Sequence, residues 1–312
     1  MALLVFLTFM SLIVNQYVPV WMKDSEASHM DGVVGQFANL KGAIDFQVLG
    51  AIMAQNAGAV FVPSTTSTPV TLGLDGVPIF SAPTTGQLTA SPSCSAFANC
   101  SWTVSFMYVI HVNGVGYSSS VSANASGQID LAVNNNYYPR GDVVYDNGGV
   151  IRAQTDGQVI VAAPIFQVTR SGNDLAVAFE LVSLYQSGSA SGTSTQIVDT
   201  NVFGVNQQTY ANVTSPAGVV IKHVTPYAQA WFNFFNTTLA TSLKVSTLTS
   251  YTVTGGGDVV TVKTPYYTIQ LNTLLGGSPW VTVTINPAAM NLTFTLQQAY
   301  VNVGIGSGSN MM

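Results

Sequence analysis

The chain has 312 residues, of which 47% are hydrophobic and only 7% are charged, whereas ordinary soluble domains carry about 25% charged residues. The formal net charge is −5 and the eight Lys and Arg residues are widely scattered, which excludes the clustered basic surface that nucleic acid requires. Ser, Thr, Asn, Gln and Gly fill the polar positions instead, a composition typical of β-rich secreted or assembled proteins.

The first 22 residues contain no Asp, Glu, Lys, Arg or His. Their length suits a membrane-spanning helix, but no basic residue precedes the apolar run and no small-residue cleavage site closes it, as a secretory signal peptide requires. The nearest basic flank, Lys23, is offset at once by Asp24 and Glu26. A membrane anchor, a buried core helix and a processed filament helix all stay open. A filament helix whose short basic leader has been removed before Met1 explains the missing flank best.

The helical pattern continues beyond this apolar run. Apolar residues recur there at three-to-four spacing, which is that of one helical face: Met30, Val33, Phe37, Leu40, Ile44, Val48 and Ile52. The spacing predicts one helix over residues 1–56, about 80 Å long at 1.5 Å per residue. We expect Pro19 to kink it because proline removes an amide donor, and Gly58 and Pro63 to mark its end.

From residue 59 the apolar period changes to two, which predicts an all-β region. The expected strands up to residue 185 are 60–63, 68–74, 101–112, 128–133, 142–145, 158–169 and 175–185. The turn residues Asp146 to Gly149 and Ser171 to Asp174 lie between apolar runs and predict hairpins.

A low-complexity segment at 187–194 is either an internal boundary of the head or a long hairpin loop. Residues 225–243 break the β pattern and predict a short amphipathic helix, with Thr225 as its N-cap and Pro226 at its first position. Strands return at 247–254, 258–264, 266–274, 280–285 and 291–305.

These elements predict a mainly β fold with a long N-terminal α-helix, arranged as a lollipop. Residues 1–56 form the helix, and residues 57–312 form a β-sandwich-like head of one or two lobes with one short helix near 225–243. The possible internal boundary lies near 187–194.

No cofactor or catalytic signature is present. The sequence lacks a G-x-S-x-G motif, a P-loop and a dinucleotide-binding glycine pattern, and three separated histidines, His29, His111 and His223, do not predict a zinc site. Two carboxylate pairs are suggested by sequence proximity, Asp142 with Asp146 and Asp156 with Asp174. A calcium site at the first pair is open, but turn and capping roles are favoured. We therefore expect no enzyme activity, no metal and no cofactor.

Cys94 and Cys100 are separated by five residues and can close a small loop, which predicts a disulfide in an oxidising compartment. Five Asn-x-Ser/Thr motifs, which are acceptors for N-glycosylation if the chain is exported, occur in the sequence. Their asparagines are Asn99, Asn124, Asn212, Asn236 and Asn291. Glycans at some of them would supply the polar coat that the few charges do not.

The uncharged N-terminal run, the proline near its end and the following WMKDSEASHMDGVVGQFANLKGAID resemble the mature N-terminus of archaeal type IV pilin-like proteins, a superfamily that includes archaellins and adhesion-fibre pilins. The resemblance covers about the first 55 residues, and the head is similar only in being β-rich. Val5 stands where bacterial relatives carry Glu, as in archaeal members generally.

The resemblance implies an extracellular filament subunit, without enzyme activity, that serves adhesion. It implies a membrane-embedded leader peptidase, an assembly platform, a membrane-held state before assembly, and identical subunits as partners in a helical homopolymer. The residues that would pack in the filament core are Leu3, Leu4, Val5, Phe6, Leu7, Phe9, Met10, Leu12, Ile13 and Val14. The alternative is a single-pass surface protein whose β-rich head binds glycans or a partner cell, and a surface glycosidase is a remote third.

Overall fold

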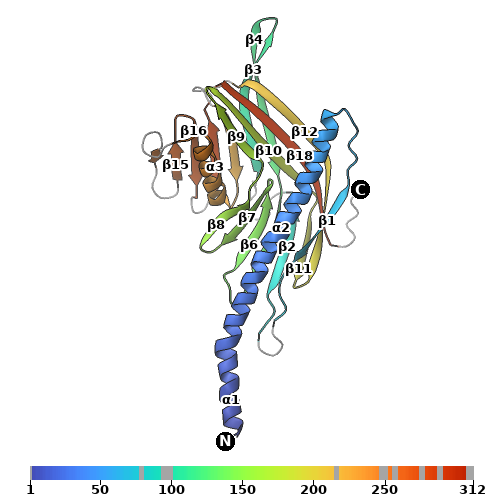
Figure 1. Ribbon diagram of the computed structural model, residues 1–312, viewed down its shortest axis with the longest axis vertical. Coiled ribbons are helices and arrows are strands. Elements are labelled where there is room, and N and C mark those ends of the chain that lie inside the picture. Colours follow the sequence, from blue (N-terminus) through green and yellow to red (C-terminus); the bar gives the residue numbers. More distant parts are fainter. Residues whose placement is uncertain are drawn as a thin grey trace.

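The computed structural model describes residues 2–76, 81–92, 101–213, 218–245, 252–254, 259–273, 278–286 and 291–306. It has the predicted lollipop architecture, a long N-terminal helix attached to a β-rich head (Figure 1). The helical elements are α1 Ala2–Leu12, a π-helical turn Ile13–Tyr17, α2 Val18–Asn56 and α3 Ala228–Ser242. The first three run on without a break, so one helix extends over 55 residues.

Two sheets make up the described part of the head. The larger has twelve strands: β1 Thr65–Thr71, β3 Ser101–Val112, β4 Val115–Ser126, β9 Phe166–Ser171, β10 Asp174–Tyr185, β12 Thr195–Val213, β13 Val219–Val224, β14 Thr252–Thr254, β15 Val259–Lys263, β16 Tyr267–Asn272, β17 Trp280–Ile285 and β18 Asn291–Ile305. Their order is β14-β15-β16-β17-β13-β3-β12-β18-β10-β9, with β1 paired to β12 and β4 paired to β3.

The smaller sheet has six strands within the described ranges: β2 Thr85–Ser91, β5 Gln128–Asn134, β6 Gly141–Asp146, β7 Gly149–Gln154, β8 Gly157–Ala162 and β11 Gly188–Gly192. Their order is β11-β2-β5-β6-β7-β8. The segment expected as a bridge or loop at 187–194 thus contains a strand, β11, which pairs with β2. Because β11 follows β10 of the larger sheet and precedes β12 of the same sheet, this part of the chain joins the two sheets.

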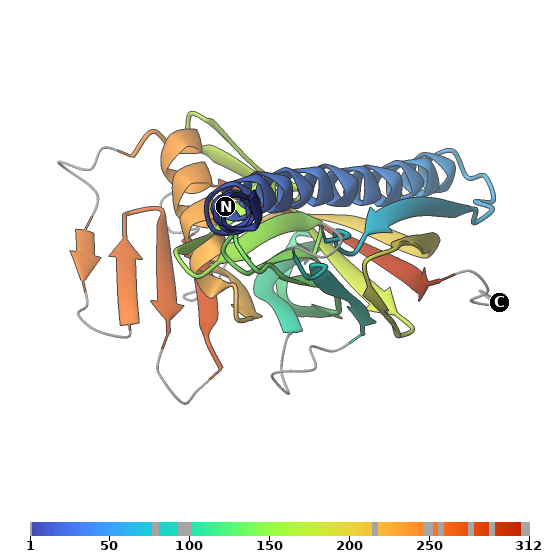
Figure 2. The same cartoon turned by 90° about the horizontal axis from the view of Figure 1, so that it is seen from below.

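The helix α2 packs on the head through the predicted apolar stripe. Every residue of that stripe is buried, with exposures between 0% and 8%: Met30, Val33, Phe37, Leu40, Ile44, Val48 and Ile52. They share one hydrophobic core with residues of both sheets, including Leu131 of β5 and Val301 of β18. Figure 2 shows α2 running along one side of the head. The same helix therefore covers a core that lies between the two sheets.

A second hydrophobic core lies around α3. The helix buries Trp231 and Phe235 and half-buries Phe234. The rings of Phe234 and Phe235 pack against Phe166 and Phe179 of the larger sheet. The expected helix start is wrong by two residues: α3 begins at Ala228, with Tyr227 as its N-cap, instead of at Pro226. The Thr225 hydroxyl accepts a hydrogen bond from the Tyr227 amide (3.2 Å) in the turn that precedes the helix.

The strand expected at 60–63 is not formed. These residues are irregular, and the side chains of Val60 and Val62 are 89% and 76% exposed. In contrast, the hairpin at 146–149 is confirmed: Asn147 and Gly148 have φ angles of 44° and 76° in the turn between β6 and β7, the backbone that favours Asn-Gly in two-residue hairpins.

A buried carboxylate joins both sheets to α3. The Trp102 indole donates to Asp146 Oδ1 (3.2 Å), the Trp231 indole donates to Asp146 Oδ2 (3.0 Å), and His223 Nε2 lies 2.7 Å from Asp146 Oδ2. The rings of Trp102 and His223 are stacked, with centroids 3.9 Å apart. Asp146 belongs to the smaller sheet, Trp102 and His223 to the larger one, and Trp231 to α3. One side chain therefore satisfies polar groups from three other elements.

We expect Asp146→Ala to lower the free energy of unfolding by about 3–5 kcal/mol, because it leaves the buried ring nitrogens of three partners without an acceptor. Urea unfolding of the full chain, followed by tryptophan fluorescence, measures the change. Asp156→Ala, in the exposed β7–β8 turn, is the matched control and should stay within about 0.5 kcal/mol of wild type. An Asp146→Ala protein as stable as this control would show that the cluster does not hold the elements together.

Candidate assembly surface

The N-terminal part of the long helix projects from the head without a covering partner (Figure 1). No residue of α1 or of the π-helical turn is buried. The ten residues expected to pack in a filament core all lie on this projecting part. Eight of them are exposed, by 39% to 75% of their surface, namely Leu3, Leu4, Val5, Phe6, Leu7, Phe9, Leu12 and Val14, and two are half-exposed, Met10 and Ile13.

The exposed apolar surface surrounds the helix instead of forming one stripe, since consecutive residues Leu3 to Leu7 are all exposed. An all-round apolar helix is stable only when it is covered on every side, by lipid or by other helices. Among the described residues, this helix is long and apolar enough to cross a membrane. The apolar run from Ala2 to Met22 is about 31 Å long, close to the hydrocarbon thickness of a bilayer. Val18 and Met22 are already buried in the molecule, so the exposed part from Ala2 to Tyr17 is about 24 Å long.

The irregularity expected at Pro19 is found one turn earlier. Residues Ile13–Tyr17 are π-helical, and α2 has Pro19 in its first turn. The amide that proline lacks would have bonded to the carbonyl of Asn15 in a regular helix. The missing donor therefore frees a carbonyl in the middle of the π-helical turn, a known cause of local helix irregularity.

Glu26 fixes the place at which the helix enters the head. Its carboxylate is fully buried and accepts hydrogen bonds from the Thr84 hydroxyl (2.5 Å) and from the amides of Asn136 (2.9 Å), Tyr137 (2.8 Å) and Tyr138 (2.6 Å). Burial by itself would raise the pKa of Glu26, but the Thr84 hydroxyl and the three amides together lower it. The carboxylate therefore stays ionised and holds three consecutive amides of one loop.

Further polar contacts secure the rest of α2. Gln47 Oε1 accepts from the Val202 amide (2.9 Å) of β12, and Gln36 Oε1 accepts from the Thr71 amide (2.8 Å) of β1. Arg152 of β7 donates to Asp31 Oδ1 (2.8 Å). Each contact joins a helix side chain to a different strand, so α2 is fixed along its length from Glu26 onward.

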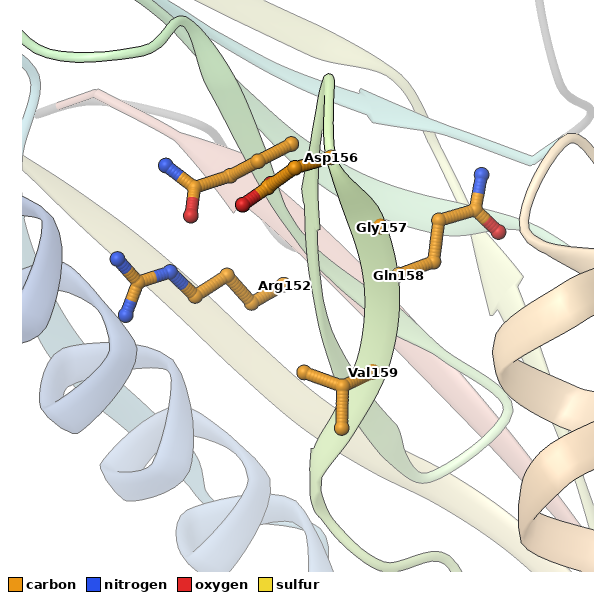
Figure 3. Close-up of a pocket in the computed structure, with 6 residues that line it drawn as sticks. Arg152, Asp156, Gly157, Gln158 and Val159 are labelled. Atoms are coloured by element: carbon orange, nitrogen blue, oxygen red, sulfur yellow. The ribbon is translucent and has the colours of Figure 1, made fainter.

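A hollow of about 470 Å³ lies beside Arg152 on the β7–β8 hairpin. Figure 3 shows Arg152 and Asp156 pointing to the side of the hairpin where α2 lies, while Gln158 points to the α3 side. Gln158 donates to the Pro226 carbonyl there (3.0 Å). The guanidinium is already bound to Asp31 and to the Tyr138 hydroxyl (2.9 Å), so it serves to fix the helix.

The carboxylates predicted to pair have other neighbours. Asp142 and Asp146 both lie on β6, four residues and about 13 Å apart, and Asp146 belongs to the buried cluster with Trp102. Asp174, at the start of β10, accepts from Asn291 Nδ2 (2.9 Å). The sequence reasoning missed Asp130 of β5. It shares a face of the sheet with Asp142, because Ala132, two residues along from Asp130 on the same strand, pairs directly with Asp142.

Asp130 and Asp142 line a cleft of about 540 Å³ that also contacts Tyr227. Burial raises the pKa of Asp130 to about 7, with a further contribution from the Asp142 charge, and burial also raises the pKa of Asp142. Burial is thus the main reason that both carboxylates hold a proton more readily than an exposed Asp does, and only Asp130 has a further contribution from its neighbour. Among the described residues, no group of three His, Cys, Asp or Glu side chains that could hold a metal ion is present.

The predicted N-glycosylation positions among the described residues are distributed over the head. Asn124 and Asn212 are exposed on β4 and β12, Asn291 is exposed at the start of β18, and Asn236 is half-buried in α3. The predicted disulfide between Cys94 and Cys100 and the acceptor Asn99 lie outside the described residues.

Comparisons with protein-family models, with curated proteins and with solved structures give no match to this chain. The functional interpretation therefore comes from its own geometry.

The raised pKa of Asp130 predicts that the free energy of unfolding depends on pH. Between about pH 4 and pH 7 the folded state holds a proton on Asp130 that the unfolded state has lost, so stability falls as pH rises through this window. Asp130→Asn removes the titration. We expect this variant to gain on the order of 3 kcal/mol over wild type at pH 8 and little at pH 3.5.

Urea unfolding at the two pH values, with Asp156→Asn as the control, measures this difference. A stability difference between Asp130→Asn and wild type that does not change with pH would contradict the account of the cleft.

Proposed function

We propose that this protein is a structural subunit of an extracellular filament, assembled through bundling of its N-terminal helices, and that it is not an enzyme. The single observation that carries the proposal is the uncovered apolar helix, which is exposed all round from Ala2 to Tyr17 while the same helix is firmly fixed to the head beyond Glu26. We call the uncovered apolar helix, residues 2–17, the apolar rod. A rigid head attached to this rod suits a polymer in which the helices lie inside and the heads lie outside.

Packing of the N-terminal helices against one another can supply enough free energy to offset the cost of association. Burial of a large apolar side chain contributes roughly 1.5–3 kcal/mol relative to water, so the ten residues of the rod contribute on the order of 15–30 kcal/mol. The loss of translational and rotational freedom on association costs about 4–15 kcal/mol. In a membrane, lipid covers the same residues before assembly. Close packing of side chains must then supply the preference for helix contacts.

A single-pass surface protein is the second candidate function. Its support is the long N-terminal helix, which is long and apolar enough to cross a membrane. The two functions make different use of the same residues. A membrane anchor needs only hydrophobicity, whereas a helix bundle also needs the shape of each side chain.

We expect Phe6→Asp and Leu7→Asp each to abolish fibres, because a buried unpaired charge opposes both membrane residence and helix packing. The unfolding midpoint of the head should stay unchanged, since both side chains are 57% exposed and neither belongs to the two cores of the described head. Electron microscopy of material sheared from cells gives the fibre yield. Val159→Asp, the same kind of change at an exposed apolar residue of the head, is the matched control and should leave fibres intact.

Phe6→Ala separates the two candidate functions. It keeps the segment apolar enough to stay in a membrane but removes the volume that helix packing uses. The filament proposal expects a marked loss of fibres with normal membrane retention. Normal fibre yield from the Asp variants, or the absence of fibres in wild type alongside stable single chains in detergent, would overturn the proposal.

A further inference from the structure

Three aromatic side chains form an exposed platform on the larger sheet. The ring centroids of Tyr185 (β10) and Phe203 (β12) are 5.3 Å apart, and the ring of Tyr300 (β18) lies 6.3 Å from Tyr185 and 6.1 Å from Phe203. Tyr185 and Phe203 are 42% and 45% exposed, and Tyr300 is half-buried. We call these three residues the aromatic platform.

The platform lies on the face of the sheet opposite α2. Along β18, Ala299, Val301 and Val303 are buried in the core that α2 covers, so Tyr300 and Asn302 between them point to the other face. The β12 strand has a register shift between Val202 and Gly204.

This bulge determines where Phe203 points. Val202 is buried toward α2, and Val205 packs on the same core, so the extra residue in the bulge places both Phe203 and Gly204 on the platform side. A side chain at Gly204 would approach the Tyr300 ring to 3.3 Å. The glycine and the bulge together allow the three rings to meet on this face of the sheet.

A groove of about 500 Å³ begins at Tyr185. Its side-chain hydrogen-bonding groups come from paired positions of β3 and β4, Ser101 with Ser126 and Thr103 with Asn124, and from β10. The lining residues are Pro92, Ser101, Thr103, Asn124, Ala125, Ser126, Ser183, Leu184 and Tyr185. None of these is charged, and all the polar groups are hydroxyls or amides.

We propose that the aromatic platform and this groove bind a neutral saccharide. One face of a sugar ring consists of C–H groups and packs on an aromatic ring, while its hydroxyl groups exchange hydrogen bonds with neutral hydroxyls and amides. A site without charge offers no compensation to a desolvated ionic ligand. The volume and the aromatic edge are those of a small-molecule site. The inference concerns the head alone and does not rest on filament assembly.

The saccharide has two possible sources with the same chemistry. Asn124 lines the groove and is an acceptor for N-glycosylation, so the sugar is either a glycan of this chain or one on another surface. Mass spectrometry of the native peptide that contains Asn124 distinguishes them. With a glycan at Asn124, added saccharide binds only after enzymatic removal of that glycan; without one, it binds the native protein directly.

The test is isothermal titration of the full chain, in a zwitterionic detergent without a sugar headgroup, with neutral gluco-, manno- and galacto-oligosaccharides of two to six units. Sialylated and sulfated oligosaccharides serve as the charged comparison. We expect binding of at least one neutral series. Phe203→Ala and Tyr185→Ala should each weaken it about threefold to tenfold, and the double variant should weaken it more than tenfold.

Thr103→Val, which removes one groove hydroxyl at constant volume, should weaken binding without a change in the unfolding midpoint. Tyr117→Ala, at an exposed tyrosine of the β3–β4 hairpin, is the control and should bind as wild type. The absence of neutral saccharide binding in both the native and the deglycosylated protein overturns the proposal. So does equal binding by the double variant, or loss of fibres in Phe203→Ala without any saccharide binding, which would identify the platform as a subunit contact.

Discussion

The burial of one stripe of α2 between two sheets is the constraint on which the rest of the molecule depends. The stripe runs from Met30 to Ile52, and its residues belong to the same core as strands from both sheets. Removing the helix would uncover the inner faces of β5, β6, β12 and β18 together. The head therefore cannot be regarded as a β domain to which a helix is attached, since the helix supplies part of its core.

The polar contacts of α2 determine its register. Apolar contacts alone would tolerate a shift of the helix along its axis, but Glu26 must meet three consecutive amides and Gln47 must meet the Val202 amide. A shift by one turn, about 5.4 Å, would leave a buried carboxylate and several amides without partners. The length of apolar helix outside the head is thus constant from one molecule to the next, which a regular polymer requires.

The elements with strong local patterns could be predicted from the sequence. Apolar spacing predicts the helix, its buried stripe and strands such as β3 and β17, because their apolar residues recur with the period of the face that is buried. The 19-residue strand β12 was not predicted, although it pairs with the 15-residue strand β18 over most of its length and with β1 near its start. Its sequence is rich in Asn, Gln and Thr, and its position in the sheet is imposed by neighbours that are distant in the sequence.

The polar sites also could not be predicted, because their partners are distant from them in the sequence. Asp142 was paired with Asp146 because they are close in sequence, yet strand geometry separates them and places Asp130 beside Asp142 instead. The partners of Glu26 are more than 50 residues away from it along the chain, and no local signal indicates them. Phe203 reaches the aromatic platform only through a bulge, a local irregularity that periodicity does not reveal.

Electron cryomicroscopy of material released from the cell surface tests the central claim most directly, namely that the bare apolar helix is covered by identical helices. The account predicts helical fibres in which residues 3–14 of neighbouring copies contact one another at the centre and the β-rich heads form the outer wall. Isolated single chains, each with its N-terminal helix surrounded only by lipid or detergent, would contradict it.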